Sequence, residues 1–256
     1  MPRLIFLGTS AALPQLTRAN TALALVDDET GSGLQIDCGG DPYRAQLAAG
    51  IGPDTITDLF ITHAHIDHIG GLPSLIESLR LGGRSRPLRV LAIPPVLAVA
   101  RALVAAYDFE LTLDAWGFQV TFQEVQPGEA ATLAGWPARV VSMDHSVPSS
   151  GVRLMLPGGD LAYTCDTQPT PRIVELGKGT HLLVTECTYL QAYTPAARIS
   201  KHLTAVEAGQ AAAACAAQQL ALVHLGPWPA DAIREEAGSV FSGEILIPND
   251  GDAIAV

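Results

Sequence analysis

The chain has 256 residues, of which 48% are hydrophobic and 16% are charged. This composition excludes a disordered protein and suffices for one substantial core. Acidic residues number 26 against 15 Lys and Arg, so the net charge is −11. A surface this acidic repels the phosphate backbone of a nucleic acid unless positive charge is local or comes from bound metal. The composition therefore disfavours an ordinary nucleic-acid-binding protein.

We expect the chain to stay in the cytoplasm and outside the membrane. The apolar run Leu4–Leu7 near its start is too short for the core of a signal peptide. The uncharged stretch from Ala208 to Ala230 contains glutamines and prolines, and it divides into an Ala-rich helix and a short strand rather than a membrane span. Four scattered cysteines without a CxxC pair are typical of reduced thiols in a cytoplasmic protein.

No internal repeat or linker divides the sequence, so we expect a single domain over residues 1–256, in which short apolar runs alternate with helical runs. Strands are expected at Arg3–Leu7, Ala22–Val26, Leu34–Asp37, Asp58–Thr62, Leu88–Ile93, Phe118–Val125, Arg139–Met143, Val152–Leu156, Leu161–Thr164, Leu182–Thr185, Leu220–His224 and Glu244–Pro248. Helices are expected at Leu72–Leu81, Pro95–Tyr107, Thr170–Leu176, Thr204–Ala217 and Ala230–Val240. Pro95 suits a first helical turn, and Thr204 precedes Glu207 by three residues, the spacing of a capping box. Strands outnumber helices and mostly follow one another, which favours two packed sheets with helices outside.

Three of the seven histidines fall in one short segment, between an expected strand and an expected helix. His63 and His65 are two positions apart, so they point the same way in an extended chain and can share a metal ion. Asp67 and His68 lie further round the turn and can face a second ion. Imidazole and carboxylate together favour zinc and related metals. The alternative is a polar loop with incidental histidines, which four potential ligands in six positions disfavour.

Three more potential ligands each follow an apolar run, and these are His145, Asp166 and His224. Polar residues at strand ends can converge on one edge of a sheet. Taken singly, each is better explained as a structural histidine or a turn aspartate. Taken with the first segment, they supply seven ligand positions, enough for two metal ions.

The H-x-H-x-D-H segment after a strand resembles the metallo-β-lactamase superfamily. That family has an αβ/βα four-layer sandwich, an α/β (α+β) fold of two mixed β-sheets flanked by helices with a two-metal site at one edge. Gly8-Thr9-Ser10 and Ile36-Asp37-Cys38-Gly39 resemble the opening strands of its ribonuclease Z-like branch. The segments Met143-Asp144-His145, Tyr163-Thr164-Cys165-Asp166-Thr167 and Leu222-Val223-His224 also match, in order. The resemblance implies one metal on His63, His65 and His145, a second on Asp67, His68 and His224, and Asp166 bridging them.

Two further segments resemble the phosphodiesterases of this branch. They are Ser200-Lys201-His202-Leu203-Thr204 and Val184-Thr185-Glu186-Cys187-Thr188, although Thr185 stands where the family has a histidine. The resemblance implies that His202 donates a proton to the leaving oxygen and that Glu186 orients its imidazole. The alternatives are a solvated loop histidine beside Lys201 and a purely structural buried acid.

The sequence also departs from ribonuclease Z in its basic regions. The family's RNA-gripping arm is missing, since the gap from Ser146 to Cys165 holds only a hairpin. Leu16 stands where the family's early motif has a basic residue, and Asn20 lies one place late; Arg18 is retained and is a candidate phosphate contact. Arg80, Arg84, Arg86 and Arg89 form a basic run that is either a solvated loop or a phosphate contact.

We therefore predict a metal-dependent hydrolase, namely a two-metal phosphodiesterase whose substrate is a small or cyclic phosphodiester. Its cofactors are two divalent ions, Zn²⁺ or alternatively Mn²⁺ or Fe. Asp67 binds a metal and orients or deprotonates the attacking water, and His202 with Glu186 protonates the leaving oxygen. The alternatives are ribonuclease Z-type transfer-RNA 3′ processing, hydrolysis of sulfate esters, lactones or thioesters, and a non-catalytic family member. The Pro95–Tyr107 helix either packs into the core or forms the interface of a homodimer. His181 and the cysteines receive no role.

Overall fold

Two mixed seven-stranded β-sheets pack face to face in this computed structural model, which describes residues 1–107 and 117–256. The first sheet has the order β14-β1-β2-β3-β4-β5-β6 and the second has the order β13-β12-β11-β10-β9-β8-β7. The strands of the first sheet are β14 (Ala253–Ala255), β1 (Arg3–Gly8), β2 (Ala22–Asp27), β3 (Ser32–Ile36), β4 (Ile56–Phe60), β5 (Leu88–Ala92) and β6 (Val120–Glu124). Those of the second are β13 (Glu244–Leu246), β12 (Gln219–Val223), β11 (Leu182–Glu186), β10 (Leu161–Tyr163), β9 (Ser149–Leu154), β8 (Trp136–Met143) and β7 (Ala130–Leu133).

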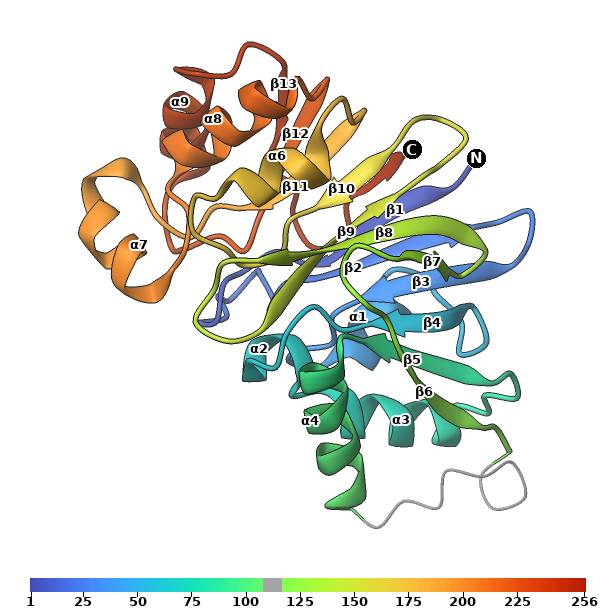
Figure 1. The fold of residues 1–256 in the computed structure, drawn as a ribbon. Coiled ribbons are helices and arrows are strands. Elements are labelled where there is room, and N and C mark those ends of the chain that lie inside the picture. The colour runs from blue at the N-terminus through green and yellow to red at the C-terminus, as the bar shows by residue number, and fades with distance from the viewer. Residues whose placement is uncertain (108–116) are drawn as a thin grey trace.

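Helices cover the outer face of each sheet (Figure 1). On the first sheet lie α1 (Pro42–Ala48), α3 (Leu72–Leu81) and α4 (Pro94–Ala105), and on the second lie α6 (Pro171–Gly177), α8 (Ala205–Cys215) and α9 (Ala230–Gly238). The short α2 (Ile66–Ile69), the 3₁₀ turn Gln191–Tyr193 and α7 (Thr194–Ser200) complete the described helices. The predicted four-layer sandwich is confirmed. Within the described residues, no helix is long and apolar enough to cross a membrane.

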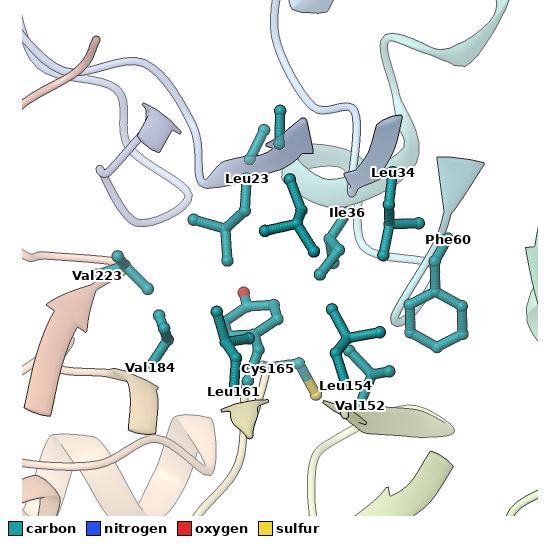
Figure 2. Packing of buried hydrophobic residues seen from close by; sticks show 14 of the residues in the cluster. Leu23, Leu34, Ile36, Phe60, Val152, Leu154, Leu161, Cys165, Val184 and Val223 are labelled. Atoms are coloured by element: carbon teal, nitrogen blue, oxygen red, sulfur yellow. The ribbon is translucent and has the colours of Figure 1, made fainter. Parts of the chain in front are cut away.

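The core forms where the inner faces of the two sheets meet. Figure 2 shows Leu23, Ile36 and Phe60 of the first sheet opposite Val152 and Val184 of the second, and all five are at most 1% exposed. Because β3–β4–β5–β6 and β10–β11–β12–β13 run parallel within their sheets, both faces of their central strands are covered and most of the residues in these strands are apolar.

Each expected strand and helix has a counterpart, but six described elements escaped the sequence patterns, among them α2 and the 3₁₀ turn Gln191–Tyr193. Strand β7 is short and rich in alanine, β14 has three residues, and α1 and α7 are brief helices that begin beside prolines. The capping box is confirmed, because Thr204 accepts from the Glu207 amide and the Glu207 carboxylate accepts from the Thr204 amide. The apolar side of α4 packs into the core through Val96, Leu97, Ala100 and Val104. This accounts for much of the helix's apolar character; the homodimer stays a prediction.

Candidate metal centre

The candidate ligands gather at one edge of the sandwich because they follow the carboxyl ends of strands that point the same way. His63 follows β4, His145 follows β8, Asp166 follows β10 and His224 follows β12, while Glu186 ends β11. The two sheets are joined at this edge, where the Ser150 amide donates to the Thr62 carbonyl at 3.1 Å. Side chains far apart in the sequence therefore meet in one place.

Sharp backbone turns at the strand ends help to aim these side chains. Asp37, Cys165 and His224 each directly follow a strand or lie within two residues of its end, and each has a left-handed conformation, with φ of 63°, 53° and 52°. Such a conformation costs an L-residue roughly 1–2 kcal/mol. Its recurrence at one sheet edge is typical of a functional site, where the surrounding structure maintains local strain.

The first ligand cluster consists of His63, His65, His145 and Asp166, whose ligand atoms all lie within 4.8 Å of one another. His65 Nδ1 is 3.1 Å from His63 Nε2 and 3.1 Å from His145 Nε2. Asp166 Oδ2 stands 3.7 Å from His63 Nε2. Three ring nitrogens thus converge on one point beside a carboxylate.

The second cluster consists of Asp67, His68, Asp166 and His224, again within 4.8 Å. Asp166 Oδ2 lies 3.3 Å from His68 Nε2 and 3.2 Å from His224 Nε2. Asp67 Oδ2 lies 3.4 Å and 3.3 Å from the same two nitrogens. Asp166 belongs to both clusters, so its position suits a carboxylate shared by two ions.

Most of these imidazoles have a hydrogen-bond partner on the side facing away from the clusters. His68 Nδ1 lies 2.8 Å from Asp37 Oδ2, and His63 Nδ1 lies 3.0 Å from the hydroxyl of Thr62, which itself donates to Asp37. His145 Nδ1 donates to the Lys201 carbonyl at 3.0 Å. A proton held on the outer nitrogen leaves the inner nitrogen with a lone pair, the arrangement in which histidine binds metals.

The residues present fit a pair of metal ions on three grounds. The inner nitrogens of His63, His65 and His145 present lone pairs to one another, which is unfavourable without a cation between them. Their 3.1 Å spacing is close to the ~3.3 Å edge of a tetrahedron built on metal–nitrogen distances of ~2.0–2.1 Å. Among the described residues, the buried His68 Nε2 and Asp166 Oδ1 also have no hydrogen-bond partner.

The electrostatics of the protein without metal favour ligand forms in the first cluster. Burial lowers the pKa of His63, His65 and His145, so these rings are neutral. Burial raises the pKa of Asp166, but the charges of His224 and His68 lower it more, and the net pKa is well below its usual value. Burial lowers the pKa of His68, but Asp166 and Asp37 raise it well above its usual value, so a metal that binds His68 must displace a proton.

A histidine and a glutamate lie against the second cluster. His202 Nδ1 is 2.8 Å from Glu186 Oε1, and these two residues with His224 form a third group within 4.8 Å. Glu186 is fully buried, whereas the His202 side chain is 13% exposed. Burial lowers the pKa of His202, but Glu186 and then Asp166 raise it to about 9. The structure therefore brings together the two residues that the sequence paired as proton donor and orienting acid.

The basic run of Arg80, Arg84, Arg86 and Arg89 does not reach this edge. Arg84 is 2% exposed and donates to the carbonyls of Pro53, Ile56 and Pro87, at the starts of β4 and β5 and so at the opposite edge of the sheet. Burial lowers its pKa to about 10.

The other arginines of that run also bond within the protein: Arg80 with Glu77, Arg86 with the carbonyls of Gly31 and Asp54, and Arg89 with Asp58. Arg18 donates to Thr9 and to the Pro248 carbonyl. These arginines tie loops together. His181 lies apart, beside Gln218.

A family profile described as a β-lactamase superfamily domain matches residues 34–225, a span that contains every member of both clusters. The chain belongs to the metallo-β-lactamase superfamily. Within the family it belongs to the ribonuclease Z-like branch. A ribonuclease Z of Halorubrum lacusprofundi is 30% identical over 308 aligned positions that include 99% of this chain and 97% of that protein. Because this alignment is longer than the 256 residues of this chain, some of its positions are gaps in this chain.

Solved structures of this family share the fold. The metallo-β-lactamase fold protein YhfI of Bacillus subtilis has a TM-score of 0.83 at 21% identity, covering 100% of both chains. The short form of human tRNase Z has a TM-score of 0.79 at 22% identity, covering 99% of this chain and 98% of its own. Together with the ligand clusters, the family supports a metal-dependent hydrolase. The ribonuclease Z relatives favour the ribonuclease alternative over the small-diester interpretation of the sequence.

Proposed function

We propose that this metallo-β-lactamase-fold protein is a phosphodiesterase of the ribonuclease Z type. It cleaves transfer-RNA precursors on the 3′ side of the transfer RNA that they contain. The observation that supports this most directly is the His202–Glu186 pair beside two His/Asp clusters, in a chain 30% identical to a ribonuclease Z over almost its whole length. The pair matters because an RNA alkoxide is a poor leaving group and needs a proton donor.

We assign one divalent ion to His63, His65 and His145 and a second to Asp67, His68 and His224, with Asp166 shared. Ions held there would neutralise charge on a phosphoryl group and lower the pKa of water. Zn²⁺, Mn²⁺ and Fe all accept this donor set.

Two of the chain's own residues handle the protons of the reaction. Burial raises the pKa of Asp67, but His224 and His68 lower it more, so its carboxylate stays ionised and orients or deprotonates the attacking water. His202 bonds Glu186 through Nδ1, which leaves Nε2 to protonate the departing oxygen. The Glu186 carboxylate fixes the ring and stabilises its charged form.

A small phosphodiester is the second candidate substrate, and the short β9–β10 connection supports it. The resemblance to ribonuclease Z would place an RNA-gripping arm between His145 and Asp166, and in that interval only residues 155–160 join β9 and β10. The net charge of −11 also weakens long-range attraction of RNA, and the arginines that bond backbone carbonyls are turned toward the protein rather than toward a substrate phosphate.

The test is a side-by-side turnover assay of the metal-loaded protein. The substrates are a precursor transfer RNA, a nitrophenyl phosphodiester, and 2′,3′- and 3′,5′-cyclic nucleotides, each at low and moderate salt. We expect cleavage of the RNA at its 3′ side, strongly reduced in His202→Ala and unchanged in the control His181→Ala. Hydrolysis of the small diesters with the RNA intact would instead establish the second candidate. No turnover of any phosphodiester by protein carrying two ions would overturn both.

A further inference from the structure

The buried carboxylate of Glu186 uses both oxygens, and only one of them serves His202. Oε1 lies 2.8 Å from His202 Nδ1 and accepts from the Thr167 amide, also at 2.8 Å. Oε2 accepts from the hydroxyl of Thr188 at 2.7 Å. Orienting His202 therefore does not account for the second oxygen.

Thr188 connects this second oxygen to a candidate metal ligand. Its Oγ1 lies 2.8 Å from His224 Nδ1 as well as 2.7 Å from Glu186 Oε2. A hydroxyl has one proton, and a carboxylate can only accept it, so the hydroxyl in turn accepts from the His224 Nδ1–H. His224 thus keeps its proton on Nδ1, so Nε2, which lies 3.2 Å from Asp166 Oδ2 and 3.3 Å from Asp67 Oδ2, is the nitrogen that can give its lone pair to a metal.

We propose that Thr188 is a positioning residue that lets one carboxylate, Glu186, orient two histidines with different tasks. Through Oε1 the carboxylate holds the proton donor His202, and through Thr188 it holds the metal-binding form of His224. The inference rests on the proposed function for the role of His202, whereas the effect on His224 requires only that a metal binds the second cluster. Glu186, Thr188 and His224 are all buried, so water does not readily replace the hydroxyl.

Thr188→Val removes the hydroxyl while keeping the shape of the side chain. The change leaves Glu186 Oε2 and the His224 Nδ1–H without their partner. Loss of an outer hydrogen bond to a metal-binding histidine weakens metal affinity by about 10–100-fold. We expect that loss for one of two bound ions, and recovery in Thr188→Ser, which restores the hydroxyl. Thr164→Val is the control, because Thr164 is also buried and its hydroxyl contacts neither a histidine nor a carboxylate.

The readouts are independent of turnover. Competition with a chelator gives the affinity of each ion, and NMR of histidine-labelled protein reports whether a slowly exchanging Nδ1–H persists on His224. The proposal predicts weakened binding of one ion and loss of that signal in Thr188→Val only. Unchanged affinity and an intact signal in Thr188→Val would overturn it. If Thr188→Val does not fold, Thr188→Ala compared with Thr188→Ser replaces it, and equal metal affinity in these two would overturn it equally.

Failure of this inference is distinguishable from failure of the proposed function. Wild-type protein that binds two ions but cleaves no phosphodiester would refute the function and leave the Thr188 measurements meaningful. Wild-type protein that cleaves RNA while Thr188→Val binds metal normally would refute the inference alone.

Discussion

Replacing His202 by alanine separates its proposed role as a proton donor from any role in shaping the site. In the structure the imidazole is paired with Glu186 at 2.8 Å, and its pKa of about 9 keeps it protonated at neutral pH. The more basic a leaving group is, the more its departure depends on a proton donor. His202→Ala should therefore slow substrates with alkoxide leaving groups and nearly spare nitrophenyl esters, whose leaving group departs without a proton.

General acid catalysis contributes about 10²–10⁴-fold, or ~2.7–5.4 kcal/mol at 1.36 kcal/mol per tenfold. We expect kcat on RNA or an alkyl diester to fall within that range. The nitrophenyl diester should lose less than about tenfold, because its transition state requires little protonation. Glu186→Gln, which keeps a hydrogen-bond acceptor but removes the charge, should fall between wild type and His202→Ala.

The assay compares kcat for the two leaving groups in each variant at fixed metal content, with His181→Ala as the control for loss of a histidine elsewhere. Equal losses on both leaving groups would refute the role of His202 as proton donor. They would assign His202 to metal or substrate binding instead.

Three further predictions each concern the surroundings of one side chain. Tyr163 is fully buried and its hydroxyl has no hydrogen-bond partner among the described residues. Tyr163→Phe should therefore raise the free energy of unfolding by about 1–3 kcal/mol. A lower melting temperature of this variant in thermal unfolding would mean that the hydroxyl has a partner. In metal-free protein, NMR titration should show His202 protonated up to about pH 9. Because this pKa is raised, the stability it contributes is fully present below about pH 6.5 and is lost as pH rises through 9. Glu186→Gln should reduce that dependence, since it removes the larger of the two carboxylate charges that raise the pKa. Asp166→Asn should weaken the binding of both metal ions and Asp67→Asn the binding of only one, as measured by metal analysis, since Asp166 belongs to both clusters. Equal effects of the two substitutions would contradict the shared position of Asp166.

The sequence identified the candidate ligands because each one either follows a recognisable apolar run or lies in the dense histidine segment. Strand ends are visible in a sequence, and parallel strands bring their ends to one edge. Their convergence in space therefore required only the correct sheet order, which the family resemblance supplied.

The outer partners of the histidines could not be found in the same way. Asp37 meets His68 across 31 residues of chain and Thr188 meets His224 across 36, and no local pattern encodes these contacts. The one available signal was a short polar residue beside a strand end, as in Thr62 before His63, and such residues are too common to single out.

Charge was the least reliable guide, because a sequence does not reveal where a guanidinium points. Arg84 lies in a basic run that would suit a solvated loop, yet it is buried and satisfies three backbone carbonyls. Arginine at a loop crossing is well suited to this, since its planar fork offers five donors. A count of basic residues therefore overstates the positive charge available to a substrate.

The position of the short β9–β10 connection bears on which substrate the site accepts. Strand β9 starts at the site edge with Ser149, next to His63, and β10 returns to that edge before Asp166, so residues 155–160 turn at the opposite edge. An arm inserted there would leave the strand ends that carry the ligands unchanged. Its absence removes a means of holding the body of an RNA and removes none of the groups proposed to break the phosphodiester. The missing arm therefore bears on binding of the substrate, and it does not by itself restrict the chemistry to small diesters.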